Sequence, residues 1–343
     1  MMSTVAILVA VLGLAVLMVV HELGHHLAAR AFKLRVIRFS IGFGPALWRH
    51  QPRGSDTVYQ IALIPFLAYV QVAGMNPFEE SDPDDKGSYA NASLTARILT
   101  VVGGPLANYL FAMGLFLFAF LSFGNPVLTT TVEVMPDTPA AAAQMKDGDK
   151  VVRIADVAVD DFDAMREQIL KSPGQALKVE VLRDRKPVTL TMTPEPKGEN
   201  GGGVIGVRPG RGYQSMTFKQ AVTESIQRPA MVVKELVVGL VQLVVQREKP
   251  EVAGPVRIVK YGAMMVETGT YDILYFLAKL SAYLGGFNLL PMPALDGGRL
   301  MFLIYEAVAR RKPNARIEAQ IHALGLLMFL ALIAVVTVQD FTK

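Results

Sequence analysis

Two histidines and a glutamate near the N-terminus have the spacing of a metal-dependent hydrolase site. His21, Glu22 and His25 form the pattern His-Glu-x-x-His. Residues four positions apart share one face of a helix, so both imidazoles can bind the same ion. The pattern is typical of zinc sites, where zinc lowers the pKa of a bound water to about 7 and the glutamate accepts its proton. The sequence therefore predicts zinc-dependent hydrolysis with Glu22 as the general base.

The motif lies at the end of a run that has the composition of a transmembrane helix. No charged residue occurs from Val5 to Val20, and about 20 apolar residues span the hydrocarbon core of a bilayer. Charged side chains at membrane depth are costly and usually functional. This favours a reactive centre over two histidines that share a helix end by accident. His26 points about 100° away from His25, so we expect it at the membrane interface rather than on the metal.

Composition indicates a protein that crosses the membrane several times. Hydrophobic residues make up 52% of the chain and charged residues only 19%, which is more apolar than a typical soluble protein. The chain has no cysteine, which excludes disulfides, thiol nucleophiles and cysteine-ligated metals. The apolar composition makes the lipid bilayer an expected partner. The Lys and Arg residues do not form one long basic face, so we expect no nucleic acid as a partner.

Hydropathy predicts four transmembrane helices and an orientation. Basic residues gather in residues 30–53 and 299–316, two loops that lie on the same side of a four-span protein. The positive-inside rule makes that side cytoplasmic. Both termini and the long segment from residue 125 to about 270 are then extracytoplasmic. The spans run from about residue 4 to 29, 98 to 123, 273 to 290 and 321 to 338.

A catalytic zinc needs a third protein ligand, with water in the fourth position. Asp296 is the best candidate, because Pro291 and Pro293 break the third span just before it. A broken helix can turn an acid inward where protein or a cavity surrounds it. The broken segment lies near the cytoplasmic side, which is also the expected depth of His21 and His25.

The extracytoplasmic segment begins with a small domain at residues 127–195. A strand, a short helix, the turn Lys146-Asp147-Gly148-Asp149, a strand, a helix and a hairpin follow one another. This order resembles a bacterial PDZ domain, although another small α/β module would share it. PDZ domains bind an extended peptide at a sheet edge.

Residues 196–272 are expected to hold a linker and membrane-associated amphipathic helices, one of them from Phe218 to Gln246. The first membrane half is then residues 1–126, and the second is residues 273–343.

Taken together, the motifs resemble the site-2 protease family of intramembrane zinc proteases, most closely its bacterial RseP branch. The resemblance covers nearly the whole chain and is much more specific than any single motif. It is carried by five segments: His21-Glu22-Leu23-Gly24-His25, Phe39-Ser40-Ile41-Gly42-Phe43-Gly44-Pro45, Gly104-Pro105-Leu106-Ala107-Asn108, Ala253-Gly254-Pro255-Val256, and Asn288 through Gly298.

The resemblance implies a role for each matching position. His21, His25 and Asp296 match the ligands of one Zn²⁺ per chain, and Glu22 matches the catalytic base. Asn288 matches a position that holds the substrate backbone. The segment Val58 to Val72 matches a membrane-reentrant β-hairpin, whose edge strand would pair with an unwound substrate. That strand would consist of Tyr59, Gln60, Ile61, Ala62, Leu63 and Ile64.

Three features depart from the family pattern. The hairpin turn reads Pro65-Phe66-Leu67-Ala68-Tyr69 where the family usually has two glycines before the tyrosine, which changes the turn that the backbone can adopt. Only one PDZ-like domain is present where a longer relative has two, and His26 replaces an apolar residue.

We therefore expect a polytopic α-helical membrane protein of the bacterial inner membrane, with a reentrant hairpin and one extracytoplasmic PDZ domain. Its expected activity is intramembrane cleavage of single-span proteins, such as an anti-sigma factor or remnant signal peptides, in regulated intramembrane proteolysis. Two alternatives are a membrane-anchored zinc protease that cuts soluble substrates and a non-catalytic PDZ scaffold. The apolar run before His21 argues against the first, and the complete set of candidate ligands argues against the second.

Overall fold

A computed structural model describes residues 3–76, 82–197, 201–246 and 253–342 of the chain. Two compact units can be distinguished by their internal contacts. The helical unit consists of Met1–Ser122 together with Phe218–Lys343, and the sheet unit consists of Phe123–Thr217. All residues of the metal-site motifs lie in the helical unit.

Three helices of the described chain are long and apolar enough to cross a membrane: α1 (Thr4–Ala31), α2 (Leu94–Phe123) and α9 (Ala315–Thr342). They correspond to the first, second and fourth predicted spans. The third predicted span is α7 (Thr270–Asn288), a helix of 19 residues that carries Lys279 near its middle and packs against α1, α5 and α6. It does not reach the same apolar length, so four spans remain a prediction.

The remaining helices of this unit are partly as predicted. The amphipathic helix α5 (Phe218–Gln246) has the predicted bounds, and α6 (Pro255–Thr268) follows it. The segment after the third predicted span was expected to be a loop, but it contains α8 (Asp296–Ala309). A short 3-10 turn, η1 (Tyr89–Asn91), precedes α2.

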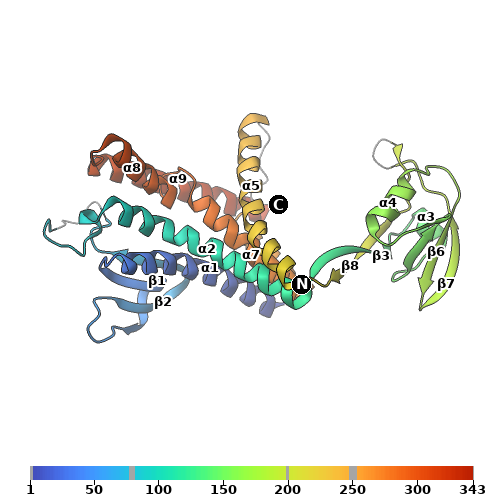
Figure 1. The fold of residues 1–343 in the computed structure, drawn as a ribbon, viewed down its shortest axis with the longest axis horizontal. Coiled ribbons are helices and arrows are strands. Elements are labelled where there is room, and N and C mark those ends of the chain that lie inside the picture. The colour runs from blue at the N-terminus through green and yellow to red at the C-terminus, as the bar shows by residue number, and fades with distance from the viewer. Residues whose placement is uncertain (1–2, 77–81, 198–200, 247–252, 343) are drawn as a thin grey trace. The chain divides into compact units, whose positions relative to one another are not determined.

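Two long strands, β1 (Val36–His50) and β2 (Val58–Val72), pair with each other beside α1 (Figure 1). Gly42 and Gly44 both have φ near +94°, which a residue with a side chain adopts only with strain, and β1 turns back on itself there. As a result the first half of β1 lies between two segments of β2, with Phe39 opposite both Tyr59 and Val70.

This arrangement corrects the predicted edge strand. Residues 59–61 of β2 lie opposite residues 39–41 on one side and residues 48–50 on the other. Tyr59, Gln60 and Ile61 therefore have neighbours on both sides and cannot accept a further strand. The cause is the length of β1, whose second half covers the side that a simple hairpin would leave open. The outer segments are residues 46–50 of β1 and 68–72 of β2.

The sheet unit has its own core and a sheet in the order β7-β6-β4-β3-β8, with the short β5 paired to β4. Buried residues from several of these strands pack against Met165 and Ile169 of α4. The elements are β3 (Asn125–Val134), α3 (Pro139–Ala142), β4 (Lys150–Ile154), β5 (Val157–Ala158), α4 (Phe162–Leu170), β6 (Leu177–Arg183), β7 (Lys186–Met192) and β8 (Val207–Gln214).

The domain boundary at residue 195 was wrong. Strand β8 pairs with β3 from Asn125 opposite Gln214 to Val134 opposite Val207, so the unit continues to Thr217. Two glycines and a proline in β8 weaken any strand pattern in the sequence, which explains why the segment resembled a linker.

Candidate metal centre

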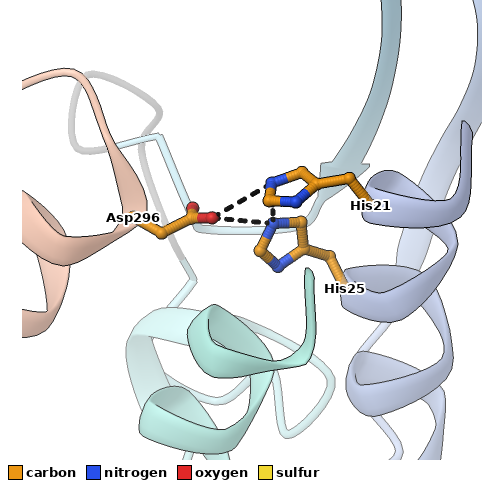
Figure 2. A group of neighbouring side chains, drawn as sticks. All are labelled: His21, His25 and Asp296. Atoms are coloured by element: carbon orange, nitrogen blue, oxygen red, sulfur yellow. Dashed lines mark hydrogen bonds and ion pairs between the residues drawn. The ribbon is translucent and has the colours of Figure 1, made fainter. Parts of the chain in front are cut away.

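The side chains of His21 and His25 on α1 meet the side chain of Asp296, which is distant in sequence, at one point (Figure 2). The Nε2 atoms of His21 and His25 are 3.3 Å apart. One carboxylate oxygen of Asp296, Oδ2, lies 3.1 Å from Nε2 of His21 and 3.2 Å from Nε2 of His25. Both imidazoles are buried. The three atoms form a nearly equilateral triangle of potential ligands.

The triangle has the size that a tetrahedral zinc requires. Protein ligands bind zinc at about 2.0–2.2 Å, which places any two of them about 3.3–3.6 Å apart in a tetrahedron. The observed sides of 3.1–3.3 Å are close to this range. Two imidazoles and a carboxylate are also a donor set that zinc accepts. The residues His21, His25 and Asp296 therefore fit one zinc ion, with a fourth position open to water or substrate.

Glycines bring α2 close enough to α1 to surround the histidines. A Cβ atom added to Gly104 would lie 2.3 Å from Nε2 of His25, and one added to Gly24 would lie 2.2 Å from the carbonyl oxygen of Gly103. Any side chain at these positions would force the helices apart or displace the imidazole. The glycines at 24, 103 and 104 thus create the space for the metal ligands.

The backbone of α2 fixes the ring of His25. Nδ1 of His25 is 2.8 Å from the carbonyl oxygen of Thr100. A carbonyl oxygen only accepts, so Nδ1 carries the proton and Nε2 presents its lone pair to the triangle. Such a partner on the distal nitrogen of a metal-binding histidine orients the ring and raises its basicity as a ligand.

A tight loop before α8 positions Asp296 beside His21 and His25. Ala294 has φ of +73°, a left-handed conformation that is uncommon for a residue other than glycine, and α8 starts at Asp296. A Cβ at Gly297 would lie 2.0 Å from the carbonyl oxygen of Leu290, and one at Gly298 would lie 2.4 Å from that of Met292. The two glycines therefore allow the loop to fold back over the start of α8.

Glu22 points from the same helix toward the β-sheet. Its Oε2 atom accepts a hydrogen bond of 2.9 Å from the backbone N–H of Val70 in β2. Glu22 is partly buried and is next in sequence to His21. This hydrogen bond holds the carboxylate at the outer edge of β2, one residue along α1 from His21.

The predicted substrate-binding residues have hydrogen-bond partners and exposures that differ from one residue to the next. The amide of Asn288 donates to the carbonyl of Leu284 in its own helix at 2.9 Å. Gln60 is buried, and its amide donates to the hydroxyls of Ser40 and Tyr69. Ala62 is also buried, whereas Ile61, Leu63 and Ile64 are exposed. The hydroxyl of Tyr59 is 3.2 Å from Nε2 of His26.

The sequence does not indicate the roles of three groups beside the site. They are the N–H of Val70, the carbonyl of Thr100 and the amide of Asn108, which is 3.2 Å from Nδ1 of His21. Two are backbone atoms, which no residue pattern reveals. Asn108 was noticed only as part of a motif, and the sequence contained no indication of its partner.

Comparison with known proteins agrees with this geometry. The model of peptidase family M50 matches residues 9–332. A putative zinc metalloprotease of Nostoc sp. is 31% identical over 98% of this chain and 96% of its own length. A putative zinc metalloprotease of Synechocystis sp. is 33% identical over 99% of this chain and 95% of its own. The zinc metalloprotease RasP of Geobacillus kaustophilus is 29% identical over 94% of both chains.

Proposed function

This chain belongs to peptidase family M50 and is a zinc metalloendopeptidase, and we propose that it cleaves transmembrane segments of single-span proteins inside the membrane. The observation that carries the proposal is the position of the metal triangle. His21 and His25 belong to α1, which is apolar enough to cross a membrane. His21 lies about 25 Å along the helix from Thr4, at a rise of about 1.5 Å per residue, so a spanning α1 places the triangle at membrane depth.

The chemistry follows from the residues around the triangle. When bound, zinc supplies a Lewis acid for a peptide carbonyl and lowers the pKa of water. Glu22 is placed to accept a proton from the attacking water and to return it to the leaving amine. The Val70 N–H holds the carboxylate of Glu22 in this position, and the Thr100 carbonyl holds the ring of His25.

The outer edge of β2 is the proposed docking strand for an unwound substrate. Ala73 donates its N–H inward to the carbonyl of Arg35, and backbone direction alternates along a strand, so Ala68 and Val70 direct their backbone groups outward. A peptide bond within a helix is shielded, and an extended substrate needs partners for its freed N–H and C=O groups. This edge replaces residues 59–64 as the proposed substrate strand, and it lies beside Glu22.

Exposed apolar side chains support membrane insertion of the β1–β2 sheet. Six large apolar residues near its bends have at least two fifths of their surface exposed. So large an apolar surface on a small sheet suits contact with lipid, as proposed for a reentrant element. The six are Phe43, Leu47, Trp48, Ile61, Leu63 and Ile64.

We propose the bacterial inner membrane as the location, with the sheet unit and both termini extracytoplasmic. Two contacts support a common side for the two basic loops. Lys312 donates to the carbonyl of Ala90, and Arg97 pairs with Glu306, and both Ala90 and Arg97 lie where the first loop leads into α2. The sheet unit, as a single PDZ-like domain, would then admit substrates with short ectodomains and block intact ones. Anti-sigma factors already trimmed outside the membrane and remnant signal peptides are the proposed substrates in regulated intramembrane proteolysis, the role expected of the RseP branch.

The proposal is tested with the full chain in proteoliposomes that contain a tagged single-span substrate. Wild type, Glu22→Gln and the exposed control Glu133→Gln are compared, and mass spectrometry locates the cut. We expect cleavage within the apolar segment by wild type and control, and a loss of at least about 100-fold in Glu22→Gln, since general base catalysis contributes about 10²–10⁴-fold. A cut only outside the apolar segment, or full activity in Glu22→Gln, would refute it.

A further inference from the structure

The ring of His21 needs a partner that the backbone does not provide. If Nε2 binds zinc, its lone pair must face the metal, and the proton of the neutral ring must then reside on Nδ1. His21 is buried, and a buried N–H without an acceptor costs about 1–3 kcal/mol. Within the described chain, the polar group found at Nδ1 is the side-chain amide of Asn108, 3.2 Å away.

The side chain of Asn108 has an oxygen that can accept the Nδ1–H of His21. It lies on α2, is fully buried, and its carbonyl Oδ1 has no hydrogen-bond partner among the described residues. The atom drawn toward His21 is Nδ2. The two ends of an amide have nearly the same shape, so rotation by 180° exchanges them without a steric penalty. Rotation lets Oδ1 accept the Nδ1–H of His21, so both of these atoms gain a partner, and it moves Nδ2 to the position that Oδ1 held.

We propose that Asn108 is a positioning residue that sets the tautomer of His21 by accepting its Nδ1–H. The carbonyl of Thr100 does the same for His25, so one helix orients both histidine ligands. The proposal rests on the zinc site described above, but it concerns a residue that contacts neither the metal triangle's third ligand nor the substrate edge. A hydroxyl from Ser281 of α7 donates to the backbone carbonyl of Asn108 at 2.8 Å and ties its helix to a third element.

The decisive measurement is zinc affinity of the full chain in detergent, by competition with a fluorescent zinc chelator. Asn108→Leu keeps the volume but removes the acceptor, and we expect about 10–100-fold weaker zinc binding, the usual effect of losing such a partner. Asn108→Asp keeps an acceptor at the same place, and we expect affinity within about threefold of wild type. Ser281→Ala is the matched control, since it removes a buried hydrogen bond of the same α2–α7 contact and should leave zinc affinity unchanged.

These variants separate positioning from packing. If Asn108 only stabilised the helix contact, a buried carboxylate in Asn108→Asp would be at least as harmful as leucine, and Ser281→Ala would weaken zinc binding too. Asn108→Asp decides the matter even if the leucine variant fails to fold: near wild-type zinc affinity supports the proposal, and loss of zinc overturns it. Wild-type affinity in folded Asn108→Leu would overturn it as well. If the wild-type protein binds zinc normally but does not cleave the substrate, the proposed intramembrane activity is refuted instead.

Discussion

The backbone N–H of Val70 donates a hydrogen bond to Oε2 of Glu22 at 2.9 Å. This bond joins the outer edge of β2 to the general base of the metal site. The same edge is the proposed docking strand for substrate. Glu22, which performs the proton transfer, is therefore bound to the strand that receives the substrate. The position of Glu22 therefore depends on the β-sheet as well as on its own helix.

Removal of that bond is predicted to slow catalysis without loss of zinc. Val70→Pro deletes the N–H at a position whose N–H points out of the sheet, where proline is tolerated. A hydrogen bond to a charged group contributes about 1.5–3 kcal/mol, so we expect kcat to fall about 10–100-fold. Zinc content, measured by elemental analysis, is expected to stay at the wild-type level because the N–H touches no metal ligand.

Val70→Ala is the control for this change, since it shortens the side chain and keeps the N–H. It should retain nearly full kcat. Equal kcat values for the proline and alanine variants would show that the Val70 N–H does not position Glu22.

The contact between Gly104 and His25 makes a second prediction. Because a Cβ at residue 104 would lie 2.3 Å from Nε2 of His25, Gly104→Ala must displace the imidazole or separate α1 from α2. We expect a loss of zinc affinity of at least tenfold, measured by chelator competition. Gly114 on the same helix has open space around its Cβ position, and Gly114→Ala should bind zinc normally. Normal zinc binding in Gly104→Ala would mean that the helices do not pack as described.

A third prediction concerns the acid stability of the sheet unit. Burial tends to raise the pKa of Asp149, but two hydrogen bonds from Arg183, of 2.9 and 2.7 Å, and one from the Lys146 N–H hold that pKa below its usual value. A carboxylate with a lowered pKa stabilises the fold at pH values above its unfolded pKa of about 3.9. This contribution is lost as the pH falls through the lower, folded value.

The measurement is chemical denaturation of residues 123–217, whose core comes from its own residues. Arg183→Leu leaves the buried carboxylate of Asp149 without its charged partner and is expected to lower the free energy of unfolding at pH 7. Asp149→Asn should lose less stability than wild type between pH 4.5 and 2.5. Parallel pH curves for wild type and Asp149→Asn would contradict the role of this pair.

Residue patterns predicted those features of the structure that depend on local sequence. The pattern His21-Glu22-x-x-His25 and the apolar run before it needed only helical periodicity, and the structure contains both on α1. The bounds of α5 followed from the amphipathic pattern alone. Asp296 could be predicted because Pro291 and Pro293 break the segment before it, and the structure brings it to the histidines.

Patterns failed where long-range pairing decides the structure. The turn of β1 at Gly42 and Gly44 covers a strand that would otherwise be an edge, and β8 joins the sheet through β3 despite its glycines. The partners of Glu22 and His25 are backbone atoms of Val70 and Thr100. The side chains at these two positions do not indicate the contacts, so the sequence could not predict them. The helix α8 was missed because the broken segment before it resembled a loop that continued.

The most direct test is the zinc coordination of the purified full chain, measured by elemental analysis and zinc X-ray absorption. We predict about one zinc per chain with two imidazole nitrogens and one carboxylate oxygen as protein ligands. Asp296→Ala should bind far less zinc than wild type, whereas the exposed control Asp163→Ala should bind the same amount. Full zinc occupancy with an unchanged absorption spectrum in Asp296→Ala would show that His21, His25 and Asp296 do not meet at one metal ion, and the account of this protein would be wrong.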